Sequence, residues 1–385
     1  MKKIVILGGS HRDIPLIKAA QDLGYFVITL GDREYYLGHN YSDKAYKTDF
    51  TDLDAVREVI KAEEADYILP GSGEVSYLNC VKLSHELNKG NFDTLEVANI
   101  IHNKWKFKDF CLANNISTPK GVYYSSQTDI EKFSYPLVVK PTDLSGGRGV
   151  NIVKNSKELQ LSLTQAKNFS DEIFLEEYIE GELIAYSVFL QNQHISYAFS
   201  GADKSYLNPF LVSTAYPIKL SKDVTLKLNS DIEKIAQKLS LVDGMFHLQV
   251  FIQNNTPYII DVTRRIPGDL YPYLIEYTHA VEYSKAVVKA YIGQALKKEL
   301  NIKEENFIVR HVVMPDKNGI YNGLKIDKSI EDNIIYQLEL LQSKTEITDY
   351  LHTQLAIIFI KLKSIDDYND PNRLIRAVMA RRDDV

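Results

Sequence analysis

The chain contains little cysteine. Cys80 and Cys111 are the only two in 385 residues, and their spacing matches no metal-binding pattern. Two such thiols build no disulfide framework, which excludes a disulfide-stabilised secreted domain and favours a reducing compartment. We therefore expect a cytoplasmic protein in which both thiols are buried core residues.

Long apolar stretches and long runs of like charge are absent as well. After two lysines, the N-terminus has only the four-residue apolar run Ile4 to Leu7, which is too short for a signal peptide or a membrane span. The formal net charge of −6 provides no general attraction to nucleic acid or to an anionic membrane. We therefore expect neither nucleic acid nor a membrane among its partners.

No internal repeat or low-complexity linker divides the chain, although its 385 residues exceed one ordinary hydrophobic core. Two or three domains are therefore expected. In residues 1–95, short apolar strands alternate with amphipathic helices, a pattern typical of a doubly wound parallel sheet. The predicted strands cover residues 4–7, 26–30 and 67–70, and the predicted helices cover residues 14–23 and 53–62.

In such a sheet the loops that follow the strands share one edge. Segments 8–12, 32–33 and 71–74 should therefore converge and could hold a small substrate, although tight turns also account for their glycines. Gly8-Gly9-Ser10 resembles the start of a dinucleotide site, but no third glycine follows at the expected position. NAD-dependent oxidoreduction therefore ranks last among the functions considered.

A phosphate-binding signal lies in residues 136–150, where an apolar strand ends at Lys140 and a glycine-rich loop follows. Gly146, Gly147 and Gly149 leave room for backbone N–H groups to approach a phosphate, while the strand fixes the lysine. The loop is not a Walker A motif, because the lysine precedes the glycines and no Gly-Lys-Ser/Thr follows them. It predicts a nucleoside triphosphate site, with a flexible hairpin as the alternative.

A second nucleotide signal is the acidic segment 176–182, which interrupts two predicted strands. Exposed backbone there could pair with the edge of an adenine ring beside Tyr178 and Ile179. Glu182 could accept hydrogen bonds from ribose hydroxyls. An acidic hairpin turn is the alternative.

A third signal is a predicted hairpin, with strands 244–252 and 257–265 around a turn that contains asparagine. Alternation places every second side chain of each strand on one face. The residues on these faces are His247, Gln249, Phe251, Asp261, Thr263 and Arg265. If the two faces coincide, oxygen ligands converge, and Mg²⁺ prefers such ligands together with phosphate oxygens and water. A polar hairpin that faces solvent is the alternative, and His247 is either a base or a hydrogen-bonded core residue.

In their order and spacing, Lys104, Lys140 with its glycine loop, and the Glu-Glu-Tyr-Ile segment 176–179 resemble the ATP-grasp superfamily. The similarity is to its carbamoyl-phosphate-synthetase-like and biotin-carboxylase-like branch. It implies an α/β and α+β multidomain fold, whose expected domains are a doubly wound domain over residues 1–95, a two-lobed ATP-grasp domain over 96–298 with a glycine-loop lid at 118–178, and a small C-terminal α+β domain over 299–385.

The resemblance also implies an activity. In an ATP-dependent carboxylate–amine ligase, ATP converts a small-molecule carboxylate to an acylphosphate, and an amine then displaces phosphate to form an amide. ATP with Mg²⁺, or with Mn²⁺ instead, is the expected cofactor. The alternatives are a bicarbonate-activating, carboxylase-like ATP-grasp enzyme and a nucleotide-binding protein with degenerate catalysis.

Residue roles follow from the same resemblance. The residues implied to bind the nucleotide are Lys104, Lys140, Ser145, Gly146, Gly147, Gly149, Glu176, Tyr178, Ile179 and Glu182. Lys140 and Arg265 are the catalytic candidates, because a lysine neutralises phosphate charge and a guanidinium fork binds carboxylate or acylphosphate oxygens. Arg264 is a weaker candidate for that second role.

The implied metal positions, Gln249, Asp261 and Thr263, depart from the family pattern of glutamate, an acidic residue and asparagine. Gln249 offers only its carbonyl oxygen, so one anionic ligand is lost. Either a single Mg²⁺ is held mainly by Asp261 and ATP, or a carboxylate such as Asp243 or Asp269 compensates, or catalysis is lost. We favour an active enzyme, because the lysines, Asp261 and Arg265 are all present.

Two polar loops and the C-terminal part are less specific. Segment 199–211, which contains Asp203, and segment 267–273 either line the acceptor pocket or are ordinary turns. Further along, strands are predicted at 307–314 and 355–362 and a closing helix at 371–382. This part either completes the wall of the active site or contributes to the interface of a homodimer.

Overall fold

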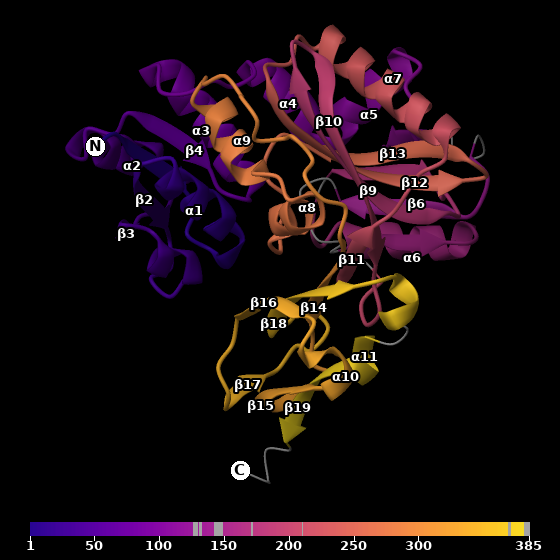
Figure 1. The fold of residues 1–385 in the computed structure, drawn as a ribbon. Helices are drawn as coiled ribbons and strands as arrows, with labels where there is room; N and C mark the ends of the chain where they lie inside the picture. The colour runs from indigo at the N-terminus through magenta and orange to yellow at the C-terminus, as the bar shows by residue number, and fades with distance from the viewer. Residues whose placement is uncertain are drawn as a thin grey trace.

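A computed structural model of the chain describes residues 1–125, 130, 133–141, 149–170, 172–209, 211–368 and 371–380. Three residues of the predicted phosphate loop, Ser145, Gly146 and Gly147, lie outside this description. The described elements form an N-terminal domain, a central sheet with a smaller lid sheet beside it, and a C-terminal lobe (Figure 1).

The N-terminal domain is built on a four-stranded sheet of order β3-β2-β1-β4 in which every pair is parallel. Its strands are β1 (Lys3–Leu7), β2 (Phe26–Gly31), β3 (Lys44–Lys47) and β4 (Tyr67–Pro70), and its helices are α1 (Ile14–Asp22), α2 (Leu53–Ala62) and α3 (Glu74–Leu87). The predicted doubly wound sheet is confirmed. The sequence did not predict β3, because this mostly exposed edge strand carries no apolar run.

Two helices connect this domain to the lid sheet. They are α4 (Leu95–His102) and α5 (Lys104–Ala113). The lid sheet has the order β5-β8-β6-β7, and its pairs are antiparallel. Its elements are β5 (Gly121–Tyr123), β6 (Leu137–Pro141), β7 (Asn151–Val153), α6 (Ser156–Ala166) and β8 (Ile173–Glu177). Alternate residues of β6 and β8 pack on α6, and the core they form includes Val139, Leu163 and Leu175.

The central sheet has eight strands in the order β13-β12-β9-β10-β11-β14-β18-β16. They are β9 (Glu182–Gln191), β10 (His194–Lys204), β11 (Thr214–Pro217), β12 (Gly244–Gln253), β13 (Thr256–Thr263), β14 (Phe307–Val313), β16 (Ile334–Glu339) and β18 (Ala356–Leu362). Strand alternation separates its two faces: Phe246 and Leu248 share a core with Leu228 and Ile232 of α7 (Lys222–Lys238), whereas Met245 packs toward the N-terminal domain.

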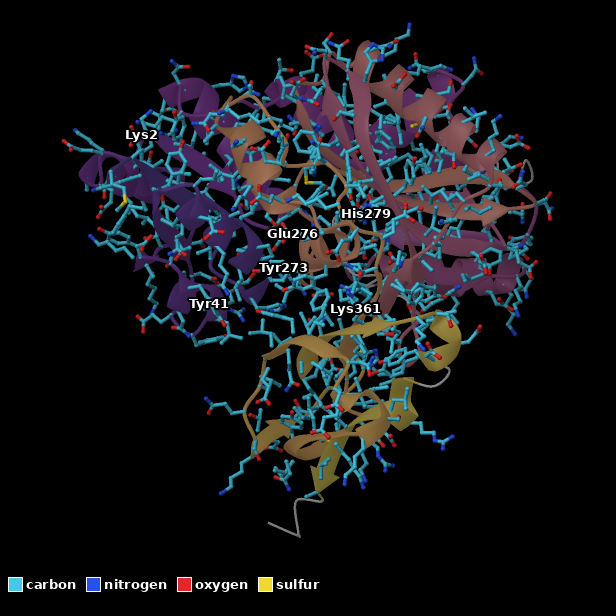
Figure 2. All side chains as sticks on the ribbon, in the orientation of Figure 1. Lys2, Tyr41, Tyr273, Glu276, His279 and Lys361 are labelled. Atoms are coloured by element: carbon cyan, nitrogen blue, oxygen red, sulfur yellow. The ribbon has the colours of Figure 1, made fainter. Side chains whose placement is uncertain are left out.

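Helices α8 (Tyr271–His279) and α9 (Tyr283–Tyr291) lie between the N-terminal domain and the central sheet (Figure 1). Figure 2 places Tyr273 and Glu276 of α8 between Tyr41 of the N-terminal domain and Lys361 of β18. The ring of Tyr273 packs edge-on against Phe359, with ring centroids 6.3 Å apart. One hydrophobic core therefore joins the N-terminal domain, α8, α9 and one face of the central sheet.

The C-terminal lobe contributes β14, β16 and β18 to the central sheet and adds a three-stranded sheet of order β17-β15-β19. Its remaining elements are β15 (Gly319–Ile326), α10 (Lys328–Glu331), β17 (Thr345–Ile347), α11 (Pro371–Leu374) and β19 (Ile375–Ala380). The predicted closing helix is wrong, because α11 ends at Leu374 and the following residues pair with β15. Burial of Ile375 beside exposed Arg376 follows the period of a strand. The three domain boundaries stay predictions.

The prediction that both thiols are buried is confirmed. Cys80 and Cys111 are both buried and free, and burial raises the pKa of the Cys111 thiol to about 12. Among the described helices, none is long and apolar enough to cross a membrane.

Candidate active site

A cavity of about 350 Å³ lies between the central sheet and the N-terminal domain. Its lining includes residues of the N-terminal domain (Arg12, Ser72, Glu74), of α5 (Lys104), of the sheet and the turn before α8 (Asp203, His247, Gln249, Asp261, Thr263, Arg265, Gly268, Asp269), of the start of α8 (Tyr271), and of the C-terminal lobe (Arg310, Gln354). Segments 8–12 and 71–74 thus reach one site, as predicted, whereas residues 32 and 33 are not part of this lining.

Asp13 fixes the two N-terminal loops that reach the cavity. Its carboxylate accepts the backbone N–H of Gly9 at 2.9 Å and of Ser72 at 2.7 Å. A Cβ atom on Gly71 would lie 2.8 Å from the same carboxylate, so glycine is needed there. These N–H groups serve Asp13 and are not available to a dinucleotide phosphate, which agrees with the low rank of an NAD site.

The predicted convergence is confirmed for the polar hairpin residues, whereas Phe251 is not among the cavity residues. Gln249 of β12 lies directly opposite Asp261 of β13, and His247 lies opposite Thr263. Directly opposed side chains of an antiparallel pair share one face of the sheet, and all four line the cavity. His247 accepts or donates a hydrogen bond with Ser187 at 2.7 Å, and burial, with Arg265 and Arg310 nearby, lowers its pKa to about 3. Neutral His247 therefore fits the hydrogen-bonded core residue better than a base.

Arg265 presents an incompletely paired cation to the cavity. Its guanidinium donates to the carbonyl of Ile266 at 3.1 Å, and Nη2 lies 4.0 Å from the carboxylate of Glu74. Its Nε has no hydrogen-bond partner among the described residues. Burial lowers the pKa of Arg265 although Glu74 and Asp261 favour its charge. A buried guanidinium with a free donor is suited to an anionic ligand.

The metal positions fit a hard cation only in part. Asp261 supplies one carboxylate, and the amide oxygen of Gln249 and the hydroxyl of Thr263 are the neutral oxygens beside it. Among the described residues, no group of three or more His, Cys, Asp or Glu side chains could hold a metal ion. A cation here therefore depends on oxygens from a nucleotide.

The structure bears on the two carboxylates proposed to compensate for Gln249. Asp243 accepts the N–H of Asn192 at 2.7 Å and is not among the cavity residues. Asp269 lines the cavity, but its carboxylate lies 3.3 Å from Arg12 and accepts from Gln354 at 3.1 Å. Glu74 is a further carboxylate of the lining, and burial, with Asp261 nearby, raises its pKa.

Lys140 belongs to a buried triad that the sequence did not predict. Glu176 on β8 binds Lys140 from β6 and Lys108 from α5, and the Lys108 contact is 2.9 Å long. Glu176 is 3 % exposed and Lys108 is 4 % exposed. Burial alone would raise the pKa of Glu176, but the two ammonium groups lower it to about 2. The sequence signal for Lys108 is its place one helical turn after Lys104.

We expect Lys108→Met to lower the free energy of unfolding by about 1–3 kcal/mol, because Glu176 then loses one of two charge-assisted hydrogen bonds. Urea denaturation at neutral pH measures this loss. Lys106→Met is the matched control, since Lys106 is exposed on the same helix. A loss no larger than that of the control would show that Lys108 does not stabilise Glu176.

The remaining described residues of the implied nucleotide site are Gly149, Tyr178, Ile179 and Glu182. Gly149 has a φ of +73°, and a Cβ there would lie 2.7 Å from Pro141. The backbone N–H of Tyr178 donates to the carbonyl of Pro136 at 3.2 Å, and Ile179 is buried. Glu182 is exposed at the start of β9. Their nucleotide contacts stay predictions, as do those of Lys104, Lys140 and Glu176.

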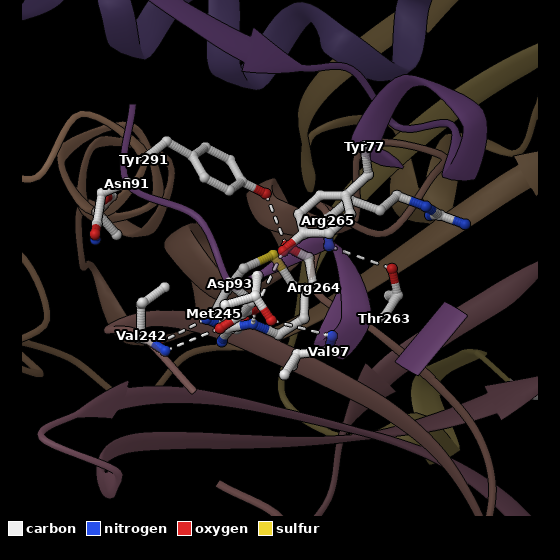
Figure 3. A network of polar contacts seen from close by, with 12 residues as sticks. Tyr77, Asn91, Asp93, Val97, Val242, Met245, Thr263, Arg264, Arg265 and Tyr291 are labelled. Atoms are coloured by element: carbon white, nitrogen blue, oxygen red, sulfur yellow. Dashed lines mark hydrogen bonds and ion pairs between the residues drawn. The ribbon is translucent and has the colours of Figure 1, made fainter. Parts of the chain in front are cut away.

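Arg264, the weaker candidate for substrate binding, is occupied in a different network (Figure 3). Its Nε donates to Asp93 at 2.8 Å, and its two terminal nitrogens donate to the carbonyls of Met245 at 2.6 Å and Val242 at 2.7 Å. The hydroxyl of Tyr77 also donates to Asp93, at 3.2 Å. Arg264 therefore joins the hairpin to the segment before α4 and is not a cavity residue.

Comparisons with known proteins agree with this architecture. The family model of the ATP-grasp domain matches residues 133–272. A carbamoyl phosphate synthase large chain from Clostridium botulinum (strain Kyoto / Type A2) is 23% identical over 290 residues, which are 69% of this chain and 27% of that protein. The chain thus spans about a quarter of the length of this curated relative.

Two solved structures have the same fold along nearly the whole chain. The L-amino acid ligase from Bacillus licheniformis has a TM-score of 0.85 and 18% identity, and the match covers 99% of both chains. The biotin carboxylase domain of Hydrogenobacter thermophilus 2-oxoglutarate carboxylase, solved with MgADP, ADP and bicarbonate, has a TM-score of 0.80 and 15% identity over 98% of this chain and 91% of that one. Residues 133–272 thus match the ATP-grasp domain, and the solved structures show that nearly the whole chain has the fold of these enzymes.

Proposed function

We propose that the protein is an ATP-dependent carboxylate–amine ligase. The observation that carries the proposal is the cavity that Arg265 lines with Asp261, Gln249 and Lys104, because the Arg265 Nε has no partner in the described ranges of the chain. Such a site combines a binder of acyl oxygens with groups that attract phosphates and a divalent cation. The similarity to carbamoyl phosphate synthase and to an amino acid ligase supports the same class of reaction.

The proposed reaction has two steps. An oxygen of the substrate carboxylate attacks the γ-phosphorus of ATP, and ADP leaves with the electrons of the broken P–O bond. The amine nitrogen then attacks the acyl carbon, phosphate leaves, and the nitrogen loses a proton to give the amide. Both steps depend mainly on positioning and charge stabilisation, so no side-chain nucleophile is needed.

The chain's residues divide these tasks. Lys104 and Lys140 attract the phosphates, and Arg265 holds the acylphosphate or carboxylate oxygens. Asp261 would hold Mg²⁺ with the oxygens of Gln249 and Thr263 beside it. When bound, the ion would neutralise phosphate charge. Burial of the cavity between two domains limits the water that could hydrolyse the intermediate.

Cavity size supports the ligase over a carboxylase-like enzyme that activates bicarbonate. A volume of about 350 Å³ is in the range of pockets that hold organic ligands, and bicarbonate alone would fill a small part of it. The purified protein should therefore release ADP only when an organic carboxylate and an amine are both present. ADP release and product mass are measured together across a panel of amino and sugar acids, amines and bicarbonate.

Each other outcome selects an alternative. ADP release with bicarbonate but with no organic acid would support the carboxylase-like enzyme. ATP binding without ADP release for any member of the panel would support a nucleotide-binding protein with degenerate catalysis, and the ligase proposal would then be abandoned. The predicted cytoplasmic location and a homodimer are not part of this test and stay predictions.

We expect Gln249→Glu to tighten divalent metal binding about three- to tenfold, because it adds a carboxylate directly opposite Asp261. Titration of Mn²⁺ into the ADP complex, followed by calorimetry, measures this change without turnover. Gln237→Glu on the exposed face of α7 is the charge-matched control. Unchanged Mn²⁺ affinity in Gln249→Glu would show that position 249 does not reach the metal.

A further inference from the structure

The cavity face of the central sheet carries a second pair of polar side chains beyond the metal positions. Asp203 on β10 lies opposite Ala215 on β11, and Ala215 lies opposite Arg310 on β14. Opposed residues share a face, so an acid and a base flank one alanine. Their backbones are two strand spacings apart, about 10 Å. Ala215 between them is fully buried.

Both charged groups are buried and incompletely paired. Asp203 is 7 % exposed and Arg310 is 2 % exposed. Within the part of the chain that the structure describes, Asp203 Oδ1 and Arg310 Nε have no hydrogen-bond partner, and both side chains line the cavity. Arg310 donates from Nη1 to the carbonyl of Asp269 at 3.1 Å. Burial raises the pKa of Asp203 to about 7 although Arg310 and Lys204 favour its charge. Unpaired buried polar groups of this kind are costly unless a ligand satisfies them.

Tyr271 lies beside the same two residues. Its hydroxyl is buried and has no hydrogen-bond partner among the residues that the structure describes, and the Arg310 guanidinium lies 5.5 Å from its ring centre. A Cβ on Gly201 would lie 2.5 Å from the Tyr271 hydroxyl, so glycine at this position of β10 makes room for it. Tyr271 thus adds a donor and acceptor on the cavity face, two residues along β10 from Asp203.

This group lies next to the metal positions on one surface. Gly201 is opposite Ala185 of β9, Ala185 is opposite Gln249, and Gln249 is opposite Asp261. The row of opposed residues that runs from Gly201 to Asp261 and the row that contains Asp203 therefore lie on the same face of the sheet, two residues apart along β10. A ligand bound at Asp203 and Arg310 would lie within the same cavity as the acyl group held at Arg265.

We propose that Asp203, Tyr271 and Arg310 form a zwitterion subsite, and that the amine substrate of the ligase is a free amino acid. Its ammonium group binds Asp203, and its own carboxylate, which does not react, binds Arg310. A simple amine would leave Arg310 unpaired, and a simple carboxylate would leave Asp203 unpaired. The amino acid is called a substrate because of the proposed function, on which this inference rests. Its binding to the subsite does not require turnover.

Calorimetric titration of L-alanine, L-alaninamide and propionate into the wild-type protein with ADP and Mg²⁺ tests the subsite. If alanine does not bind, glycine and the other common amino acids follow, each against its amide. We expect one or more amino acids to bind at least tenfold more tightly than the amide, which lacks the carboxylate, and than the acid, which lacks the ammonium group. Equal affinities of the three classes, or no binding of any amino acid, would overturn the proposal.

Variants then assign the charges. Asp203→Asn and Arg310→Met should each reduce the affinity for the amino acid at least tenfold while ADP binding stays unchanged. Asp223→Asn and Arg376→Met, both at exposed positions, are the matched controls. Because the first comparison uses ligands and not variants, it stands even if a variant does not fold. Undiminished affinity in folded Asp203→Asn and Arg310→Met protein would overturn the assignment.

The two proposals fail in different ways. Selective amino acid binding that depends on Asp203 and Arg310, without ADP release for any acid, would contradict the ligase and leave the subsite intact. Amide formation with simple amines as readily as with amino acids would support the ligase and overturn the subsite.

Discussion

Asp261→Asn should lower substrate-dependent ADP release by about 10²–10³-fold while the protein keeps its fold. Asp261 is the only carboxylate among the three predicted metal positions, since its partners there are Gln249 and Thr263. The asparagine keeps the size of the side chain but removes its charge. A cation beside the phosphates would then be held by neutral oxygens alone, and charge on the transferring phosphoryl group would be less well stabilised.

Two measurements separate this effect from unfolding. Circular dichroism should be unchanged, because the hydrogen bond that the Asp261 carboxylate accepts from the N–H of Val262, at 3.0 Å, joins adjacent residues of one strand. Asp243→Asn is the control, since Asp243 lies outside the cavity and should retain full activity. If Asp261→Asn keeps more than about a tenth of the wild-type rate, the metal is held elsewhere, and Glu74 becomes the carboxylate to test.

Arg264→Met should lower the free energy of unfolding by about 3–5 kcal/mol, because it leaves the buried carboxylate of Asp93 without its cationic partner. Arg264 and Asp93 are 4 % and 2 % exposed. Burial opposes the charge of Arg264, yet Asp93 and its other partners raise the pKa of the guanidinium. The variant also removes the donors to the carbonyls of Val242 and Met245.

The neighbouring arginine provides the comparison. Arg265→Met should cost much less stability than Arg264→Met, because the Arg265 guanidinium has one hydrogen bond to the adjacent residue and a long contact to Glu74. Arg265→Met should instead abolish most of the substrate-dependent ADP release. Urea denaturation and the ADP assay on both variants check this division. Similar stability losses in the two variants would contradict the assignment of Arg264 to structure and Arg265 to the site.

The pair also shows why strand alternation is useful but incomplete. Alternation in the sequence placed Arg265 with Asp261 and Thr263, and the cavity contains all three. Arg264, the weaker candidate for the same role, lies outside the cavity and binds Asp93. Alternation could not identify Asp93 as its partner, because the two residues are 171 positions apart and belong to segments with no common pattern.

Local sequence patterns determined the strands and helices, the hairpin face with Gln249 and Asp261, and the order of nucleotide motifs. These features depend on residues close in sequence, where apolar periodicity and turn residues decide the backbone. The same patterns failed at residues 375–380, where a short segment suited both helix and strand and pairing with β15 decided the outcome.

Only the tertiary structure decided which distant residues meet. Lys108 binds Glu176 across 68 positions. Asp203 and Arg310 share one face of the sheet because β11 pairs in register with both of their strands. Strand order and register are set by the packing of whole elements, to which each residue contributes a small part of the energy. The sequence by itself therefore determined the order of the predicted nucleotide motifs and the face that Gln249 shares with Asp261, whereas the buried charge pairs and the proposed zwitterion subsite depend on which elements pack side by side.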